Sequence, residues 1–500
     1  MLLHSVMSFG ERYGQDSEVF RYKRGKGGIE EVPHLKVVFE YSSPNIAKPF
    51  HAGHLRSTVI GHVLANLCEA SGHMVTRLNY LGDWGTQFGL LTVGLKRYGN
   101  SEALKSSPME HLFEVYVKVN SDVSREAEGG NKTSTPTQRE GLDIFRQLEN
   151  GDTTYLDQWQ ELRDLSVKEY RNIYKRLGVW FDEYHGEAMY VRSAQDVINR
   201  WRNMGLLEFE KDTGVGYVDM GQHLGHSSRA KVLKSDGTSL YLTRDIAAIL
   251  DRFERYQFDK IHYVVDSGQV LYFRQMAAVL NRMQTPWLNK VRDTLHVPFG
   301  RVDGMSTRRG NVVFLKDILD ESKSRMLQTI YSKETSKPVD DVDSVADVLG
   351  VSAVIVQGLK EKRQKSYTFS WEKVLNFKSD SGVFLQYSHA RLSSLAENCG
   401  VSLSEDFSAG CLTEPEAQRL VLHLTGFDTA IHEAYQELEP CILVQYLFKL
   451  GHLSNTALSC LQVKGQSTDT AQARLWLFMC SRQTLRNGLH LLGIQPLDKM

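Results

Sequence analysis

A strand, a turn and a long helix follow one another near the beginning of the chain. Residues 35–40 are short, apolar and β-branched, which predicts a buried strand. A Ser-Ser-Pro-Asn run at residues 42–45 then forms a turn. Apolar side chains recur at helical spacing over residues 51–70, Gly72 ends that helix, and residues 75–80 predict a second strand. This order predicts the first βαβ unit of a parallel sheet, which binds ligands where its strands end.

The middle of the chain predicts an insertion between two halves of this sheet. Residues 100–210 have mostly helical periodicity and many charges. Residues 259–266 predict another buried strand of the sheet, whereas residues 214–219 and 231–242 predict short antiparallel strands. After about residue 380 the chain is helical and leucine-rich to its end, which predicts a separate helical domain.

Composition excludes some classes of partner and site. The formal net charge is −1, so a nucleic-acid partner would have to be bound through local basic patches. No stretch approaches the ~18 consecutive apolar residues of a membrane helix, and we expect no membrane partner. The six cysteines form no CxxC pair, which argues against structural zinc and indicates free thiols in a reducing compartment. The first 15 residues lack the Arg- and Ser-rich composition of a mitochondrial transit peptide.

A His-Ala-Gly-His sequence stands where the first turn enters the helix. His51 and His54 are three residues apart and lie on one side of the first helical turn. Gly53 allows a ligand to approach the backbone, and the helix N-terminus adds unpaired N–H groups and partial positive charge. Such a site suits a phosphate whose charge grows during reaction. The alternative is an exposed or metal-binding histidine pair, although a zinc-protease helix has its histidines four residues apart.

This sequence resembles the HIGH signature of class I aminoacyl-tRNA synthetases. Residues 42–48 before it, residues 55–58 after it, and the Asn-Tyr-Leu-Gly-Asp-Trp-Gly-Thr-Gln-Phe-Gly block at 79–89 look like the arginine-specific branch of that class. The block could also be only a packing loop. The resemblance covers about residues 35–500 and is closest to the mitochondrial arginyl-tRNA synthetases of animals, which residues 111–117 also match.

The resemblance implies an arginine pocket built from several motifs. A planar guanidinium with five donors requires a carboxylate in bidentate geometry. Asp245, in a Tyr-Leu-Thr-Arg-Asp sequence, is the best candidate, with Glu187 as a second. Glu40 is a weaker candidate for the substrate ammonium, and Glu40 and Glu187 could equally be solvated charges. The arginine-binding residues that the resemblance implies are Ser43, Pro44, Asn45, His54, Tyr241, Asp245 and Gln269, with Glu40 and Glu187.

A second loop departs from the family pattern. Residues 304–310 (Gly-Met-Ser-Thr-Arg-Arg-Gly) stand where the family has its KMSKS loop, which clamps ATP phosphates, but no lysine stands at positions 304 or 306. Family members commonly carry a lysine just before HIGH, and Lys48 has that place. The resemblance implies catalysis by charge stabilisation from Lys48, His51, His54 and Arg308, and ATP contacts from His51, Gly53, His54, Met305, Thr307 and Arg308.

The resemblance also implies the whole architecture and activity. Residues 35–380 would be a class I Rossmann-type catalytic domain with the insertion, and residues 381–500 an all-α anticodon-binding bundle, for which a generic helical bundle is the alternative. Residues 1–34 are shorter than the N-terminal tRNA-elbow domain usual in the family. We expect an arginine–tRNA ligase that uses ATP with Mg²⁺ as its substrate complex, without a bound cofactor or a protein-held metal. Its partners would be tRNA(Arg) and L-arginine, its state a monomer, and its location the mitochondrial matrix, with the cytoplasm as the alternative.

Two other functions stay open at this point. A small-molecule nucleotidyltransferase also places HxGH at a sheet edge, although the helical C-terminal region and the Tyr241–Asp245 motif argue against it. A synthetase-like protein that holds tRNA without catalysis would fit the missing loop lysines and the short residues 1–34. The intact set of Lys48, His51, His54 and Asp245 favours an active enzyme.

Overall fold

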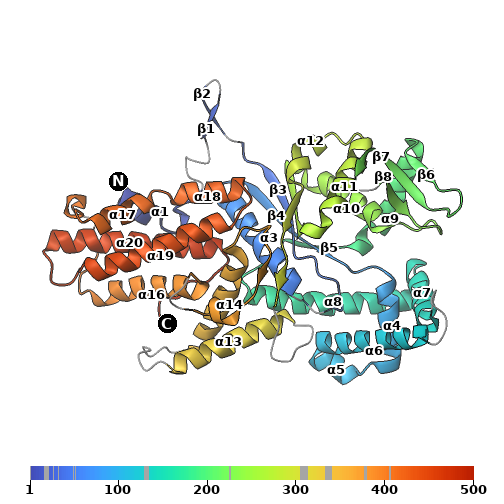
Figure 1. The fold of residues 1–500 in the computed structure, drawn as a ribbon, viewed down its shortest axis with the longest axis horizontal. Helices are drawn as coiled ribbons and strands as arrows, with labels where there is room; N and C mark the ends of the chain where they lie inside the picture. Colours follow the sequence, from blue (N-terminus) through green and yellow to red (C-terminus); the bar gives the residue numbers. More distant parts are fainter. Residues whose placement is uncertain are drawn as a thin grey trace.

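The centre of the molecule is a five-stranded sheet with the strand order β10-β9-β3-β4-β5, in which every neighbouring pair is parallel (Figure 1). Because all five strands run the same way, their carboxyl ends meet at one edge. The sheet residues Val37, Val38 and Phe39 are at most 1% exposed. The strands are β3 (Lys36–Glu40), β4 (Met74–Leu81), β5 (Glu183–Gly186), β9 (Lys260–Asp266) and β10 (His296–Phe299).

The computed structural model describes most of the chain. It covers residues 2–15, 22–25, 28–31, 33–48, 50, 52–128, 135–224, 227–304, 314–332, 341–376, 380–404 and 407–500. Within these ranges the first βαβ unit is confirmed, since helix α3 (Ala52–Ala70) connects β3 to the parallel strand β4. Gly72 follows with φ +84°, the left-handed conformation expected of a helix-ending glycine.

Helix α3 is buried on more than one side. Val63, Leu64 and Leu67 are fully buried, and the helix contacts β3, β4 and β9 as well as helices of the C-terminal region. A Cβ at Gly61 would lie 2.3 Å from the ring of Tyr41, so glycine lets the helix approach the end of β3 closely. The middle of α3 is thereby packed against Tyr41, the residue that follows β3.

The chain leaves the sheet after β4 and returns at β5. The helices α4 (Thr86–Tyr98), α5 (Ser101–Ser106), α6 (Pro108–Glu128), α7 (Pro136–Glu149) and α8 (Thr153–Arg176) lie between them. The helical insertion expected over 100–210 therefore spans residues 86–176 and is followed by a strand of the sheet. Only four residues form β5, which is too short to give a periodic signal.

A second insertion, which contains a small antiparallel sheet, lies between β5 and β9 in the chain. This sheet has the order β6-β7-β8, with β6 (Leu207–Phe209), β7 (Gly216–Leu224) and β8 (Ser227–Leu233), and follows η2 (Glu187–Tyr190) and α9 (Val191–Asn203). Of the strand expected over 231–242, only residues 231–233 lie in β8, and the remainder of that prediction is wrong. A turn in which the Lys234 N–H donates to the Thr238 carbonyl ends the sheet, and α10 (Tyr241–Tyr256) begins directly after it. Tyr241 and Asp245 consequently lie in the first turns of a helix.

Helical elements lie between β9 and β10: η3 (Ser267–Gln269), α11 (Val270–Arg282) and α12 (Leu288–Val291). After β10 the described chain is mainly helical, with α13 (Leu315–Ser332), α14 (Val342–Leu359), α15 (Trp371–Val374), α16 (Gly382–Asn398), α17 (Pro415–Leu424), α18 (Phe427–Gln436), α19 (Cys441–Cys460) and α20 (Thr468–Leu491). The short strands β11 (Val302–Asp303) and β12 (Tyr367–Thr368) pair in parallel. Among the described helices, α14 alone is long and apolar enough to cross a membrane, and 72% of it is buried inside the protein.

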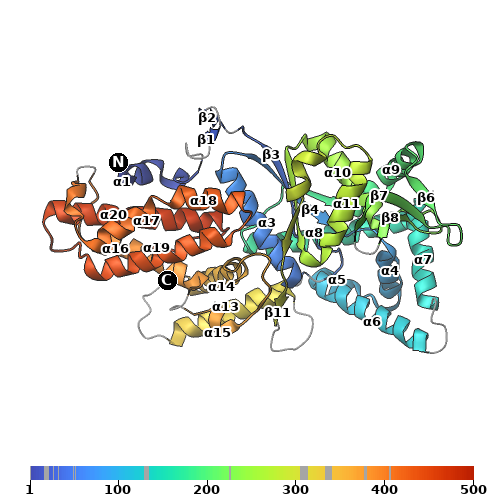
Figure 2. The ribbon, with the colours of Figure 1, turned by 45° about the horizontal axis from the view of Figure 1, so that its top comes forward.

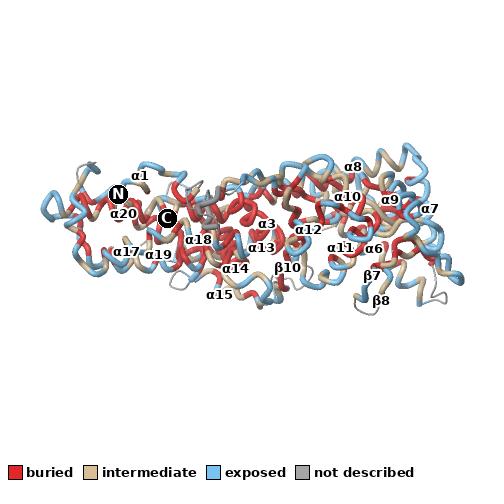
Figure 3. The backbone as a smooth tube through the Cα atoms, turned by 90° about the horizontal axis from the view of Figure 1, so that it is seen from above, coloured by how far each residue is buried: buried red, intermediate tan, exposed pale blue. Residues whose placement is uncertain are grey.

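The N-terminal segment packs on the C-terminal helices (Figure 2). Helix α1 (Leu2–Phe9) contacts α20, and the amide of Asn487 donates to the carbonyls of Gly10 and Tyr13 at 2.9 and 3.0 Å. A hairpin of β1 (Tyr22–Gly25) and β2 (Gly28–Glu31) precedes the central sheet. Buried residues continue along the long axis from the helical bundle into the sheet domain (Figure 3). The bundle therefore supports α3 from the side opposite the sheet.

Candidate active site

The loop between β3 and α3 has an unusual backbone. Ser42, Ser43 and Ala47 have φ values of +74°, +47° and +54°, the left-handed region that non-glycine residues rarely adopt. Each such residue costs on the order of 1–3 kcal/mol and persists only where its surroundings hold it. The hydroxyl of Ser57 accepts from the Ser42 N–H at 2.9 Å, and the hydroxyl of Thr58 donates to Ser42 Oγ at 2.8 Å. The first turns of α3 thus help to fix the loop.

Strand β4 holds the same loop from the other side. The Gly82 N–H donates to the Pro44 carbonyl at 3.1 Å, and the Ile46 N–H donates to the Gly82 carbonyl at 3.2 Å. A Cβ at Gly82 would lie 2.0 Å from Asn45 Oδ1, so a larger residue there would displace the Asn45 side chain. The Gly-Asp-Trp-Gly block is therefore more than a packing loop, because its first glycine positions Asn45.

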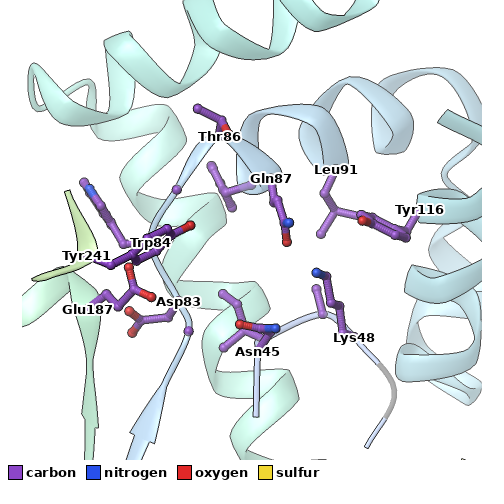
Figure 4. Close-up of a pocket in the computed structure, with 15 residues that line it drawn as sticks. Asn45, Lys48, Asp83, Trp84, Thr86, Gln87, Leu91, Tyr116, Glu187 and Tyr241 are labelled. Carbon is purple, nitrogen blue, oxygen red and sulfur yellow. The ribbon is translucent and has the colours of Figure 1, made fainter. Parts of the chain in front are cut away.

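Two cavities lie on either side of this loop. The first has a volume of about 230 Å³ and the second about 440 Å³. The first is lined by Asn45, Lys48, Trp84, Gln87, Tyr116, Glu187 and Tyr241, among others (Figure 4). The second is lined by Ser43, Gly53, His54, Arg56, Asp266, Arg301 and Asp303, among others.

Lys48 brings a positive charge to the first cavity. Its ammonium lies 5.3 Å from the ring centre of Tyr116 and makes no ion pair with any residue in the described ranges. Figure 4 shows Lys48 beside Tyr116, with Glu187, Asp83 and Tyr241 on the opposite side of the cavity. Burial lowers the pKa of Lys48, which reflects the cost of holding a charge there without a partner. An anionic ligand would supply that partner.

Three carboxylates and two arginines lie close together beside the first cavity, whose lining includes Glu187 but neither Glu40 nor Asp245. Glu40 forms a buried ion pair with Arg252, and Glu187 forms one with Arg244 at 2.6 Å. Asp245 accepts a hydrogen bond from the Tyr272 hydroxyl and makes no ion pair within the described part of the chain. When all three acids are ionised, one negative charge has no internal cation. The charge balance of the site therefore favours the binding of one further cationic group.

Burial changes the ionisation of these acids. It raises the pKa of Glu187 to about 8, because desolvation outweighs the favourable field of Arg244. Burial also raises the pKa of Asp245, against the hydrogen bond from Tyr272 and the field of Arg252. Asp245 acts electrostatically on both Glu40 and Glu187, so a cation that enters here is attracted by all three carboxylates.

The structure brings together some of the residues expected in the pocket and separates others. Asn45, Glu187 and Tyr241 line the first cavity, whereas Ser43, Gly53 and His54 line the second. Pro44 is buried in the loop, Glu40 is 4% exposed in its ion pair, and Gln269 lies exposed at the end of η3, outside both cavities. His51, Met305, Thr307 and Arg308 lie outside the described residues.

Sequence reasoning missed the arginines that surround the site. Arg252 is 1% exposed and its guanidinium lies over the rings of Tyr80 and Tyr263. The same guanidinium forms an ion pair with Glu40. Arg56 is equally buried and donates to the carbonyl of Gly300, which joins α3 to the end of β10. Arg56 stands two residues after the HAGH sequence, and that position was the available signal for it. Nothing local in the sequence identifies Arg252, whose partner is 212 residues away.

Comparison with known proteins agrees with this geometry. The model of the tRNA synthetases class I (R), catalytic domain, matches residues 20–371, and the DALR anticodon binding domain matches residues 385–500. The chain belongs to the class I arginyl-tRNA synthetase family. As an arginyl-tRNA synthetase it catalyses ATP-dependent ligation of arginine to tRNA, so the expected family, fold and activity are confirmed.

Relatives of the arginyl-tRNA synthetase include forms from two compartments. The chain is 44% identical over 499 residues to a probable mitochondrial arginine–tRNA ligase of Bos taurus, covering all of this chain and 83% of that protein. It is 42% identical over 490 residues to the cytoplasmic arginine–tRNA ligase of Saccharomyces cerevisiae, covering 97% and 79%. The arginyl-tRNA synthetase structure from Plasmodium falciparum superposes with a TM-score of 0.76 at 26% identity, covering 94% and 78%.

The raised pKa of Glu187 predicts that arginine binding depends on pH. Glu187 is mostly protonated at pH 6 in the unliganded synthetase, and a guanidinium beside it favours the ionised form. Binding therefore releases a proton, and we expect the dissociation constant for arginine to fall between pH 6 and pH 8, by up to about tenfold per pH unit. Isothermal titration calorimetry measures this dissociation constant at each pH.

One variant tests the role of Glu187, and a second variant serves as its control. Glu187→Gln should bind arginine with a weaker dependence on pH. Glu183→Gln, in the same β5–η2 segment but outside both cavities, should keep the wild-type dependence. A wild-type affinity that does not change between pH 6 and pH 8 would contradict the assignment of Glu187.

Proposed function

We propose that this synthetase binds arginine at the first cavity and ATP at the second, with the β3–α3 loop between the two reacting groups. The observation that carries the proposal is the placement of this loop, whose Asn45 and Lys48 line one cavity and whose Ser43 lines the other. The carboxylate of arginine attacks the α-phosphate of ATP and releases pyrophosphate. A terminal ribose hydroxyl of tRNA then takes the arginyl group from the adenylate.

Arginine is recognised through charge and hydrogen bonds. Its guanidinium binds Asp245, the carboxylate without an internal cation, while Glu187 and the ring of Tyr241 complete the pocket. Glu40 adds negative charge near the substrate ammonium. The α-amino and carboxylate groups of the substrate bind at the loop and at the ends of the neighbouring strands, through Ser43, Pro44, Asn45, His54 and Gln269.

Catalysis of adenylate formation requires no protein nucleophile. Lys48, His51, His54 and Arg308 stabilise the charge that grows on the phosphate, and Gly53, Met305 and Thr307 contact ATP, which enters as its complex with Mg²⁺. Lys48 compensates for the lysines missing from residues 304–310. Its unpaired ammonium supports this role, because no described side chain competes with a phosphate for it.

We also propose which domain binds tRNA, in which oligomeric state the synthetase acts and where in the cell it is located. Residues 35–380 form the catalytic domain and residues 381–500 bind the anticodon of tRNA(Arg), which the match to the anticodon-binding family supports. The synthetase acts as a monomer, away from membranes, in the mitochondrial matrix. Mitochondrial relatives at 44% identity support that location, and cytoplasmic relatives at 42% identity keep the cytoplasm as the alternative.

Charging of tRNA tests the proposed function directly. The purified chain should attach radiolabelled arginine to tRNA(Arg) in the presence of ATP and Mg²⁺, and should not attach lysine, which lacks the planar guanidinium. Acid-precipitable label is the measurement. Binding of tRNA without any charging would contradict the proposal and favour a protein that holds tRNA without catalysis.

Replacement of Lys48 tests the phosphate assignment. Lys48→Ala should reduce the rate of arginine-dependent ATP–pyrophosphate exchange, measured with tRNA present, by about 10²–10³-fold. Lys96→Ala is a matched control, because the ammonium of Lys96 lies 5.2 Å from the ring centre of Tyr155, in the insertion and outside both cavities. Near wild-type exchange in Lys48→Ala, with exchange abolished in Arg308→Ala, would refute the assignment.

A further inference from the structure

One face of α8 contacts the strained loop at three successive turns. Ser166, Tyr170 and Tyr174 are spaced by four residues, so their side chains project from the same side of the helix. All three are at most 1% exposed. Each reaches a different part of the β3–α3 loop. The helix itself comes from the insertion, more than 100 residues away in sequence.

The contacts of these three side chains cover the loop from end to end. The Ala47 N–H donates to Ser166 Oγ at 3.0 Å. The Tyr170 hydroxyl lies 2.6 Å from the Asn45 carbonyl and 3.0 Å from the Lys48 carbonyl, and shares its proton between them. The Tyr174 hydroxyl lies 2.7 Å from Ser42 Oγ. Two of the three left-handed residues, Ser42 and Ala47, are therefore held directly by α8.

The two ends of α8 are fixed independently of the loop. Near its beginning, Trp159 Nε1 donates to the Asp83 carbonyl at 2.6 Å and Arg163 Nε to the Asp83 carboxylate at 3.1 Å. At its end, the Arg176 guanidinium pairs with Asp320 of α13 and Asp347 of α14, both at 2.6 Å. The helix is thus a rigid support that spans from the loop after β4 to the helices before the C-terminal bundle.

We propose that α8 positions the β3–α3 loop for both substrates and that Tyr170 is its central positioning residue. Its hydroxyl joins the carbonyls of Asn45 and Lys48, which flank the left-handed Ala47, and so holds together the residue that faces arginine and the residue that faces phosphate. This inference rests on the proposed function for the roles of Asn45 and Lys48. Without the hydroxyl, the strained backbone relaxes in a fraction of the molecules, and that fraction binds neither substrate.

Tyr170→Phe removes the hydroxyl and leaves the ring. If the binding-competent fraction falls, the apparent affinities for both substrates fall by the same factor, and saturating substrates restore the competent loop. We expect the Kd for ATP with Mg²⁺, from calorimetry, and the KM for arginine, from pyrophosphate exchange with tRNA, to rise together about fivefold, the effect of one hydrogen bond. The kcat for exchange should stay within about twofold of wild type.

Tyr13→Phe is the control for loss of a buried hydroxyl. Tyr13 is 6% exposed and donates to the Leu424 carbonyl at 3.0 Å, and neither residue lines either cavity. It should lower the melting temperature without changing either constant. Ser166→Ala removes a different contact to the same loop and should again raise both constants together, so it decides the question if Tyr170→Phe fails to fold.

The outcomes separate this inference from the proposed function. Folded Tyr170→Phe or Ser166→Ala chains with wild-type constants would overturn the inference, as would a reduced kcat with unchanged constants. A wild-type chain that binds ATP but forms no arginyl-adenylate would instead overturn the proposed function. The ATP dissociation constants of the variants would still decide whether α8 positions the loop.

Discussion

The left-handed backbone between β3 and α3 is the constraint on which the active site depends. It turns the chain sharply enough for Ser43 to line one cavity while Asn45 and Lys48 line the other. Such a backbone is unfavourable in isolation, so the surrounding elements must over-determine it. The hydroxyls of α3, the main chain after β4 and the side chains of α8 do so together. The insertion is therefore part of the active site, although it is distant in sequence.

Charge selects what this framework can bind. The ion pairs of Glu40 with Arg252 and of Glu187 with Arg244 neutralise two acids inside the protein, whereas Asp245 accepts a hydrogen bond from the Tyr272 hydroxyl and has no ion pair among the described residues. An unpaired buried carboxylate is costly, and a cationic ligand that reaches it removes that cost. Lys48 lines the same cavity as Asn45 and Glu187, and its ammonium, which has no ion pair among the described residues, suits an anionic group such as a phosphate. Under the proposed assignment, Asp245 would attract the guanidinium of arginine and Lys48 a phosphate of ATP.

The sequence predicted those parts of the structure that have a long periodic or family signal. The βαβ unit from residue 35 to residue 80 was recognisable because α3 has nineteen residues with regular apolar spacing. Strand β5 has four residues, and the strand expected over 231–242 became the beginning of α10 after a turn, so local pattern failed at both places. The pocket residues were named from motifs, but their ionic partners could not be, because pairs such as Glu40 and Arg252 form only through the tertiary fold. The roles of His51 and Arg308 stay predictions, since both lie outside the described residues.

Citrulline provides the most direct test of the unpaired charge at Asp245, because it replaces the guanidinium of arginine by a neutral urea of nearly the same shape. The measurement is the ratio of the dissociation constants of citrulline and arginine at pH 8, by calorimetry, for the wild type and for Asp245→Asn. The account predicts a preference for arginine on the order of 10²-fold or more in the wild type, since a buried carboxylate would otherwise stay unpaired, and a loss of most of that preference in Asp245→Asn. An equal preference for arginine in both proteins would contradict it.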